Sequence, residues 1–426
     1  MISDWRPDDP AFWRATGRRV ARRNLVFSIL AEHLGFTVWT VWSVVAAQLG
    51  AYDFSTDQLF WLVALPNLVG SALRLPYTFG PARFGGRDFT VFSALLLLIP
   101  ALALGWAVGS PDTPYWVFLL IAATAGFGGG NFASSMANIT HFYPQSRQGA
   151  ALGLNAAGGN IGVSSVQLVV PLVIGAFGLA AAGWFWVPFI VVAAGCAWLF
   201  MDNLATAKAS PREQLAVAGN GQTWLMSFLY IGTFGSFIGY STAFPLLAKS
   251  LFPGSAWQTV AFLGPLLGSL VRPAGGWLAD RLGGARVTLW NFAAMAGGVA
   301  LVWLAVGSGD FWLFALAFQA LFVTAGLGNG STYRMVPAIF GALAAASGHS
   351  PEYGRRQAAA AVGIISAVGA FGGFLINRAF GMSFAAGGSP APAFLAFGLF
   401  YAACFATTWW CYARPVGAAR LAHARV

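Results

Sequence analysis

Residues 89–109 read FTVFSALLLLIPALALGWAVG, a run without a charged side chain. A helix that crosses the hydrocarbon core of a bilayer needs about 20 apolar residues, so this run is long enough to span a membrane. The composition of the whole chain agrees, because 58% of its 426 residues are hydrophobic and only 8% are charged. A soluble domain carries roughly 25% charged residues. We therefore exclude a soluble enzyme, a nucleic-acid-binding protein and a disordered scaffold.

Apolar runs of this kind occur along the whole chain and predict twelve membrane-spanning helices. They cover residues 24–50, 57–79, 89–109, 114–142, 148–175, 182–202, 223–248, 257–279, 287–307, 311–334, 357–378 and 392–413. The arginine-rich segment 1–23 is interpreted as a cytoplasmic arm. The apolar run that follows this arm is too long for the core of a signal peptide.

Basic residues mark one side of the membrane. The predicted connections on this side contain Arg83, Arg87, Arg147, Lys208, Arg212, Arg281, Arg286, Arg355 and Arg356. The basic residues of the opposite side are Lys249 and Arg378, which occur there with Asp53, Asp57, Asp112 and Asp310. Because Lys and Arg are enriched in cytoplasmic loops, both termini are predicted to be cytoplasmic, which requires an even number of spans. The net charge of +10 therefore reflects topology and not a nucleic-acid partner.

A repeated motif indicates that the chain consists of two related halves. Residues 70–74 read GSALR in the second span, and residues 268–272 read GSLVR in the eighth span, at an offset of 198. At an offset of 200, residues 126–128 (GFG) match residues 326–328 (GLG). Since six helices return the chain to the same side of the membrane, the two halves have the same orientation. A parallel repeat of this kind is the arrangement of the major facilitator fold.

The repeat divides the chain into five predicted segments. These are a cytoplasmic N-terminal arm (1–23), an N-terminal six-helix half (24–202), a cytoplasmic linker (203–222), a C-terminal six-helix half (223–413) and a cytoplasmic tail (414–426). The linker is polar and contains Pro211 and Gly219. The predicted fold class is therefore an all-α membrane protein with twelve transmembrane helices.

Longer motifs resemble those of known transporters. Residues 276–284 (GWLADRLGG) resemble the loop motif of the major facilitators, although the copy after the second span has Ala82 where an aspartate is usual. Four further segments resemble the nitrate signatures of the nitrate/nitrite porter family. They are residues 126–139 (GFGGGNFASSMANI), 151–162 (ALGLNAAGGNIG), 328–337 (GNGSTYRMVP) and 363–374 (GIISAVGAFGGF). This resemblance covers nearly the whole chain and implies a multi-pass inner-membrane transporter of nitrate and nitrite.

Arg74 and Arg272 are the predicted anion ligands. Each lies within an apolar span, where a charged side chain costs about 2.5–3.5 kcal/mol on insertion scales and usually faces the bundle interior or a cavity. A single arginine of this kind is equally well explained by snorkelling or ion pairing. Two arginines at equivalent positions of a repeat favour a shared anion near the membrane midplane. The planar guanidinium fits small planar oxyanions, and the resemblance implies this role toward nitrate and nitrite.

The resemblance implies further residues of the binding site. These are Phe127 in the first signature, Tyr230 and Phe234 one helical turn apart in the seventh span, Asn155 and Ser366. The aromatic rings would sandwich the planar anion, whereas Asn155 and Ser366 would each donate a hydrogen bond. Ordinary packing is the alternative for the aromatic residues, and an interhelical hydrogen bond is the alternative for the two polar residues.

Glycines in the fifth and eleventh spans are predicted to let helices pack closely and slide. They are Gly158, Gly159, Gly162, Gly369, Gly372 and Gly373. Small residues allow helix backbones to approach each other within a membrane. A bulky substitution at Gly159 or Gly369 is therefore expected to impair movement more than anion binding.

Glu32 is the only carboxylate well inside a predicted span, and His33 follows it. The predicted mechanism is exchange of nitrate for nitrite by alternating access, because two arginines without a counter-ion make an empty site costly to close. Intramembrane acids are candidate proton carriers, so a coupling role of Glu32 would instead give nitrate–proton symport. Pairing of Glu32 with an arginine of the arm is the structural alternative.

No cofactor, metal or enzymatic chemistry is predicted. The cysteines Cys196, Cys404 and Cys411 lie in apolar runs, and the four histidines are not paired as metal ligands. An anion channel and a facilitator for another substrate are the competing functions. The expected partners are nitrate and nitrite, protons if symport operates, and membrane lipid. The oligomeric state is left open, and a monomer is compatible with the mechanism.

Overall fold

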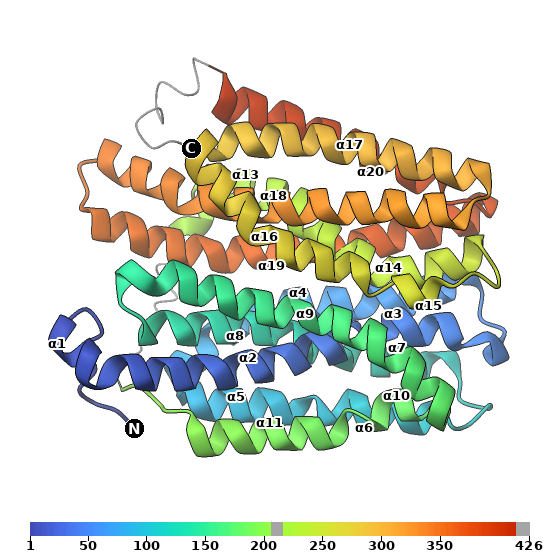
Figure 1. Ribbon diagram of the computed structural model, residues 1–426, viewed down its shortest axis with the longest axis horizontal. Helices are drawn as coiled ribbons and strands as arrows, with labels where there is room; N and C mark the ends of the chain where they lie inside the picture. The colour runs from blue at the N-terminus through green and yellow to red at the C-terminus, as the bar shows by residue number, and fades with distance from the viewer. Residues whose placement is uncertain (206–215, 415–426) are drawn as a thin grey trace. The chain divides into compact units, whose positions relative to one another are not determined.

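The computed structural model describes residues 1–205 and 216–414, and these residues are almost entirely helical (Figure 1). The middle of the predicted linker, with Lys208, Pro211 and Arg212, and the predicted tail beyond Arg414 lie outside the described residues. Within the described part, ten helices are long and apolar enough to cross a membrane. The all-helical architecture confirms the prediction of an all-α membrane protein, and the number of twelve spans stays a prediction.

The chain divides into two compact units. Unit 1 spans Met1–Phe54 and Leu65–Ser210, and unit 2 spans Ser55–Ala64 and Pro211–Val426. The main division thus falls inside the predicted linker. One helix is shared, because α4 (Thr56–Phe84) begins in unit 2 and continues in unit 1.

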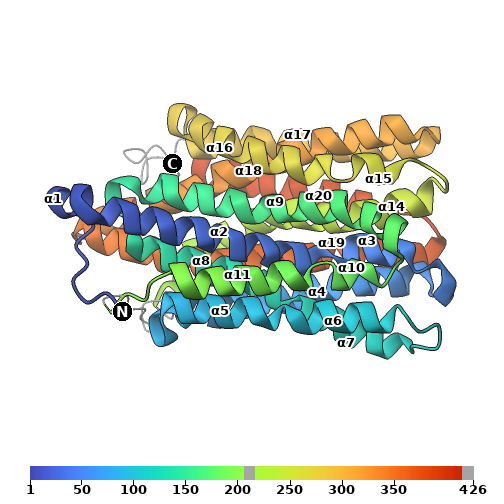
Figure 2. The ribbon, with the colours of Figure 1, turned by 60° about the horizontal axis from the view of Figure 1, so that its bottom comes forward.

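The helices of unit 1 follow the first six predicted spans. Besides α4 they are α1 (Pro10–Phe12), η1 (Trp13–Gly17), α2 (Arg18–Thr40), α3 (Trp42–Val45), η2 (Ala46–Gln48), η3 (Gly50–Tyr52), α5 (Gly86–Leu96), α6 (Leu98–Ala107), α7 (Tyr115–Ala125), α8 (Phe127–Phe142), α9 (Gln145–Phe177), α10 (Ala181–Trp184) and α11 (Val187–Phe200). The third span is formed by α5 and α6, which meet at Leu97 and lie beside α11 (Figure 2). The fourth span is formed by α7 and α8, which meet at Gly126.

Helix α2 is the centre of unit 1 and packs against α8 and α9. Small residues allow this close approach. A Cβ atom at Gly35 would lie 2.8 Å from the Asn131 side chain of α8. A Cβ atom at Gly162 of α9 would overlap the carbonyl oxygen of His33 and lie 3.0 Å from the Cβ of Phe36. The glycine-rich signatures of the sequence therefore lie where helix backbones meet.

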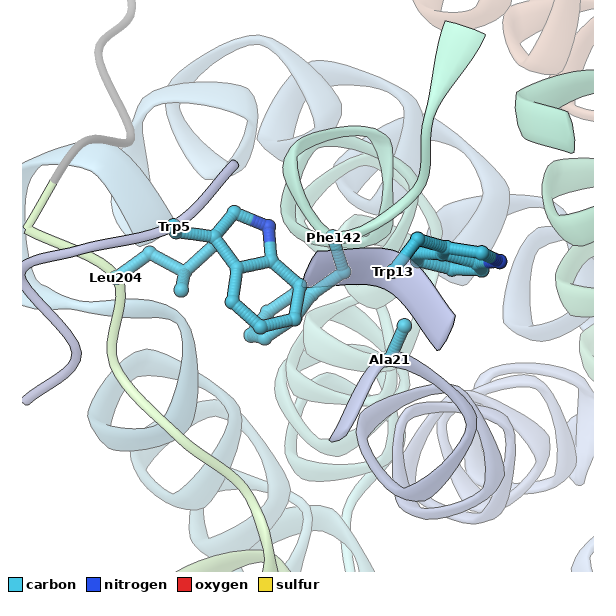
Figure 3. Close-up of a cluster of buried hydrophobic side chains, with 5 residues drawn as sticks. All are labelled: Trp5, Trp13, Ala21, Phe142 and Leu204. Atoms are coloured by element: carbon cyan, nitrogen blue, oxygen red, sulfur yellow. The ribbon is translucent and has the colours of Figure 1, made fainter. Parts of the chain in front are cut away.

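The N-terminal arm is folded onto unit 1. Helical structure starts at Pro10, where the Asp9 side chain accepts hydrogen bonds from the first amides, and it continues into the first span. Side chains from the arm, from α8 and from the segment after α11 form a buried cluster (Figure 3); its members are Trp5, Trp13, Ala21, Phe142 and Leu204. The indole of Trp5 donates a hydrogen bond of 3.0 Å to the carbonyl of His141. The arginine-rich arm therefore also has an apolar face. The sequence analysis treated the arm as polar and did not predict this face.

Backbone pairing ties the same arm to the segment that follows α11. The described part of the chain has one β bridge, a parallel pairing of Ile2 with Leu204. Ile2 donates to the carbonyl of Asn203 at 2.8 Å, and Ala205 donates to the carbonyl of Ile2 at 2.9 Å. Arg23 of α2 forms an ion pair of 2.6 Å with Asp202.

The helices of unit 2 follow the last six predicted spans. They are α13 (Gly221–Tyr230), η4 (Ile231–Gly235), α14 (Ser236–Leu251), α15 (Trp257–Val260), α16 (Leu263–Leu282), α17 (Gly284–Ser308), α18 (Phe311–Ala346), α19 (Pro351–Gly387), α20 (Ala391–Thr408) and η5 (Trp409–Ala413). Two predicted spans are absent from the ten apolar helices. Residues 223–248 lie in the continuous helical stretch of α13, η4 and α14, and residues 257–279 lie in α15 and α16, of which α16 contains Arg272, Asp280 and Arg281.

The internal repeat is visible as one contact that occurs in each unit. In unit 1, a Cβ atom at Gly126 would lie 2.8 Å from the backbone nitrogen of Gly70. In unit 2, a Cβ atom at Gly326 would lie 2.7 Å from the Cα atom of Gly268. The same glycine pairs align in the sequence repeat. Gly70 and Gly268 each lie one helical turn before the arginine of their unit, Arg74 and Arg272.

Candidate functional site

Arg74 lies in the interior of unit 1. It follows Gly70 by one turn of α4, and its side chain is fully buried. The Nε atom donates a hydrogen bond of 3.3 Å to the carbonyl of Gly129 in α8. The guanidinium carbon lies 4.5 Å from the ring centroid of Phe132 and 5.5 Å from that of Trp39. Aromatic faces attract a cation, so these two rings stabilise the charged form inside the bundle.

Arg272 occupies the equivalent place in unit 2. It follows Gly268 by one turn of α16 and is half-buried. Its guanidinium carbon lies 5.4 Å from the ring centroid of Tyr333 in α18. Its Nη1 atom is buried and has no hydrogen-bond partner in the part of the chain that the structure describes. A buried donor of this kind is costly unless it meets an acceptor, which an oxyanion can supply.

Tyr230 and Phe234 form a stacked pair, as their spacing predicted. Their ring centroids are 5.4 Å apart with an interplanar angle of 14°, and both side chains are buried. Tyr230 also lies 6.2 Å from the ring of Tyr333. The row of rings therefore connects α13 and η4 to the tyrosine beneath Arg272. This arrangement brings three predicted site residues of unit 2 into one cluster.

The aromatic residue next to Arg74 is Phe132, and the predicted residue Phe127 is not among the rings that cover this arginine. Phe127 is the first residue of α8 and is half-buried. Gly129, whose carbonyl accepts from Arg74, is three residues before Phe132 and two residues after Phe127. Residues three apart share a helix face, whereas residues two apart do not. Phe132 therefore lies on the same face of α8 as Gly129, and Phe127 does not. This spacing is the sequence signal that distinguishes the two phenylalanines.

Asn155 belongs to a buried polar network between α2, α8 and α9. Its Nδ2 atom lies 2.7 Å from Oε2 of Glu32 and 2.6 Å from Oγ of Ser135. The Ser135 hydroxyl is in turn 2.8 Å from that of Ser28. Glu32 is 1% exposed, so its carboxyl group lies in the interior of unit 1 and not at the lipid surface. The amide of Asn155 is thus committed to an interhelical hydrogen bond.

Asn160 is a buried amide that the sequence analysis did not select. It lies on α9 and is fully buried. Across residues 1–205 and 216–414, neither amide atom of its side chain has a hydrogen-bond partner. A fully buried amide without partners costs free energy, which makes Asn160 a stronger candidate for a ligand contact than Asn155. Its position inside the second signature, directly after two glycines, was the available signal.

Ser366 lies on α19, where its hydroxyl donates a hydrogen bond of 3.1 Å to the carbonyl of Gly363 in the preceding turn. It is 2% exposed. A hydroxyl that bonds to its own helix can rotate toward another acceptor. The position is therefore compatible with both interpretations of this residue.

The predicted packing glycines lie at helix contacts of their units. Gly158 of α9 faces Ile29, and Gly159 faces the carboxyl group of Glu32. In unit 2, Gly369 of α19 faces the ring of Tyr230, and a Cβ atom at Gly372 would lie 2.7 Å from the Cα atom of Gly235. Gly162 meets the backbone of His33 in α2. The contact of Gly373 lies within its own helix, where its carbonyl accepts a hydrogen bond of 2.8 Å from Asn377.

The site residues offer positive charge, aromatic faces and amide donors. In the described part of the chain, no three His, Cys, Asp or Glu side chains gather to hold a metal ion, and the three cysteines are free. A guanidinium group such as those of Arg74 and Arg272 can form charge-assisted hydrogen bonds with an anion.

Comparison with known proteins identifies the family. Residues 25–376 match the family model of the Major Facilitator Superfamily. The chain is 47% identical to the nitrate/nitrite transporter NarU of Salmonella typhimurium, with 97% of this chain and 96% of the relative covered. It is 38% identical, with the same coverage, to the probable nitrate/nitrite antiporter NarK2 of Thermus thermophilus.

A solved structure shares the fold. A bacterial homologue of the human lysosomal transporter Spinster, in an inward-facing and unoccupied conformation, has a TM-score of 0.62 at 16% sequence identity. The match covers 96% of this chain and 98% of that chain. The family model and the transporter relatives show that the chain is a multi-pass transport protein of the inner membrane and not an enzyme. The chain belongs to the nitrate/nitrite porter family of the Major Facilitator Superfamily.

Proposed function

We propose that the protein transports nitrate and nitrite across the inner membrane by alternating access, as an exchanger. The observation that carries this proposal is the pair Arg74 and Arg272, which occupy equivalent places in the repeat. Arg74 lies against the rings of Trp39 and Phe132, and Arg272 lies against the ring of Tyr333. The relatives support the substrate, because they include a nitrate/nitrite transporter and a probable nitrate/nitrite antiporter.

The chemistry of arginine fits these substrates. Nitrate and nitrite are small, planar and singly charged, and they are weak bases, so protonation does not neutralise them near neutral pH. Positive donors must therefore replace their water shell inside the protein. The guanidinium group stays protonated and donates two parallel hydrogen bonds to a planar oxyanion. Asn160, Tyr230 and the rings around each arginine supply the remaining donors and faces.

Exchange follows from the charge of an empty site. Without a bound anion the charges of the two site arginines have no counter-ion, and closing such a site away from water is costly. A bound anion lowers this cost, so the loaded protein changes access more readily than the empty one. Net uniport is then slow, and nitrate moves in one direction when nitrite moves in the other.

Proton symport through Glu32 is the second candidate. The observation that favours it is the burial of Glu32 in contact with Asn155, which makes the carboxyl group a titratable element between α2 and α9. Protonation would change this interhelical hydrogen bond and thereby couple proton binding to helix movement. The two candidates share the anion site and differ only in the coupling ion.

Counterflow in liposomes tests the exchange proposal. Purified protein is reconstituted with nitrite inside, and nitrate uptake is measured with and without an imposed pH gradient. Exchange requires anion on both sides. Uptake driven by the pH gradient into anion-free vesicles, abolished in Glu32→Gln, would instead establish symport. Conductance that neither saturates nor shows counterflow would identify a channel and overturn both candidates.

The arginine site is tested by Arg74→Lys and Arg272→Lys. Each retains the charge but removes the planar fork, and charge-assisted hydrogen bonds contribute about 1.5–3 kcal/mol, so nitrate affinity should fall at least about tenfold. Arg87→Lys is the matched control, because Arg87 forms a partly exposed ion pair with Asp88. Unchanged nitrate binding in both site variants would overturn the proposed site.

A further inference from the structure

Tyr333 forms the support of Arg272. It lies on α18, three residues after Gly330, and its ring centroid is 5.4 Å from the guanidinium carbon of Arg272. On its other side the ring meets Tyr230 at 6.2 Å with a tilt of 45°. Tyr230 in turn stacks on Phe234. The guanidinium thus rests on the end of a row of three aromatic rings.

Backbone contacts fix the position of this support. A Cβ atom at Gly330 would overlap the carbonyl oxygen of Arg272 itself, so α16 and α18 touch at the residue that carries the guanidinium. The neighbouring Thr332 places its hydroxyl 3.0 Å from that of Thr233 in η4. Tyr333 is therefore held between two elements whose spacing is set by direct contacts.

We propose that Tyr333 is a positioning residue that holds the guanidinium of Arg272 with its buried Nη1 atom directed at the transported anion; this rests on the proposed function. A carboxylate in the same place would fix the arginine equally well, but it would neutralise the charge and compete with the substrate. The face of an aromatic ring holds the cation and leaves its hydrogen-bond donors available. The ring is the functional part of Tyr333, and its hydroxyl is dispensable.

Paired substitutions separate the ring from the hydroxyl. Tyr333→Phe should bind nitrate within about twofold of the wild type, whereas Tyr333→Leu should bind it about 3- to 30-fold more weakly, which is the range expected for a desolvated cation–π contact. In the Arg272→Lys background, Tyr333→Leu should have little further effect. Tyr412→Leu, which removes another buried tyrosine of unit 2, controls for loss of packing.

Three results would overturn the positioning role. They are equal nitrate dissociation constants for Tyr333→Leu and the wild type, a defect of Tyr333→Phe as large as that of Tyr333→Leu, and a Tyr333→Leu defect that persists undiminished in Arg272→Lys. A wild-type protein that binds no nitrate would contradict the proposed function instead. Thermal unfolding of each variant shows whether a loss of affinity comes from a loss of fold.

A separate set of contacts joins the first turns of α4 to α19. Asp57 accepts a hydrogen bond of 3.0 Å from Nη1 of Arg378, and both belong to unit 2. The Arg378 side chain is 12% exposed, and its guanidinium carbon lies 3.9 Å from the ring centroid of Trp61. At Gly381 a Cβ atom would lie 2.7 Å from both ionic groups, so the pair needs this glycine.

Aromatic contacts reinforce the ion pair. Phe60 stacks on Phe380 and Phe384 of α19 at 5.8 Å in each case. Residues Ser55–Ala64 group with unit 2 through these contacts, whereas the same helix from Leu65 onward belongs to unit 1. One helix is therefore held by both units. If the units move against each other, either α4 bends or these contacts separate.

We infer that the Asp57–Arg378 pair is a latch on the non-cytoplasmic side, which releases α4 from α19 when the protein opens to that side. The distribution of basic residues along the sequence assigns both residues to this side of the membrane. A half-buried, hydrogen-bonded ion pair stabilises the closed arrangement, and its separation is part of the free-energy difference between the two access states.

Thiol labelling tests the latch. Ala64 is fully buried at the end of the α4 segment in unit 2, so Ala64→Cys in a background without the three native cysteines reports opening. Asp57→Asn and Arg378→Gln should each raise the labelling rate by an impermeant reagent several-fold in sided vesicles. The exchanged pair Asp57→Arg with Arg378→Asp should restore slow labelling.

Asp53→Asn is the matched control for the latch. Asp53 is an exposed aspartate of the same connection, with a left-handed backbone (φ 47°) that asparagine also adopts. It should leave the labelling rate unchanged. Unchanged rates in Asp57→Asn and Arg378→Gln, or fast labelling of the exchanged pair, would overturn the latch without bearing on the nitrate site.

Discussion

Asn160 and Asn155 are two side-chain amides on one helix, and they differ in how many hydrogen-bonding groups are available to a ligand. Both are fully buried on α9. Asn155 donates to Glu32 and Ser135, so removal of its amide leaves a buried carboxyl group with one donor fewer. Asn160 has no such partner among the described residues. The first residue is therefore structural in its contacts, and the second is available to an anion.

We expect Asn160→Ala to weaken nitrate binding about 10- to 150-fold, which corresponds to the roughly 1.5–3 kcal/mol of a hydrogen bond to a charged group. Its thermal stability should stay near that of the wild type, because no internal hydrogen bond is lost. Asn155→Ala should show the opposite pattern, with a lower unfolding temperature and a smaller change in nitrate affinity. Isothermal titration and thermal unfolding of the two variants check this expectation, and a larger loss of affinity in Asn155→Ala would contradict it.

At the scale of helices, glycine contacts set the distance between α2 and α9. Gly162 meets the backbone of His33, which cannot move without shifting the whole helix. Gly153 of the same helix has open space where its Cβ atom would lie. Gly162 and Gly153 are therefore a matched pair of glycines on α9. An added methyl group would meet the backbone of α2 at Gly162 and open space at Gly153.

We expect Gly162→Ala to lower the free energy of unfolding by about 1–3 kcal/mol, because overpacking forces the helices apart. Gly153→Ala is the control and should be neutral or stabilising by up to about 1 kcal/mol, since alanine favours the helix over glycine. The unfolding temperature of the purified variants measures both. Equal effects at the two positions would show that α2 and α9 are not in backbone contact.

For the molecule as a whole, sequence periodicity and charge sufficed for the helical architecture, and the repeat located Arg74 and Arg272. Residues that became site candidates through their contacts with other helices were harder to predict from the sequence. Phe132 and Asn160 differ from the predicted Phe127 and Asn155 in their contacts with other helices, and the local sequence carried only a weak signal for each. Likewise, the π-helical turn after Tyr230 leaves no hydrophobic pattern of its own. The charge distribution and the hydrophobic period describe each helix separately. A binding site depends on which helix faces contact each other, and neither pattern contains this information.

The buried arm gives an expectation at the same scale. Trp5 is 8% exposed in a cluster with Phe142 and Leu204. Trp5→Ala should destabilise unit 1 by about 3–5 kcal/mol, the usual cost of removing a large buried aromatic side chain. Phe12→Ala, which removes a half-buried ring at the edge of the same cluster, is the milder control. Thermal unfolding of the purified variants compares them, and equal stability of Trp5→Ala and the wild type would mean that the arm does not contribute to the fold.

The pairing of Ile2 with Asn203 and Ala205 also has a consequence for biosynthesis. The ribosome makes the amino terminus first, yet its partner strand emerges only after six spans have entered the bilayer. During that interval the tryptophans of the arm have no cluster to join and are open to proteases or chaperones. A nascent chain arrested before Asp202 should therefore lose its first residues to a cytoplasmic protease, and one arrested well beyond Ala205 should keep them.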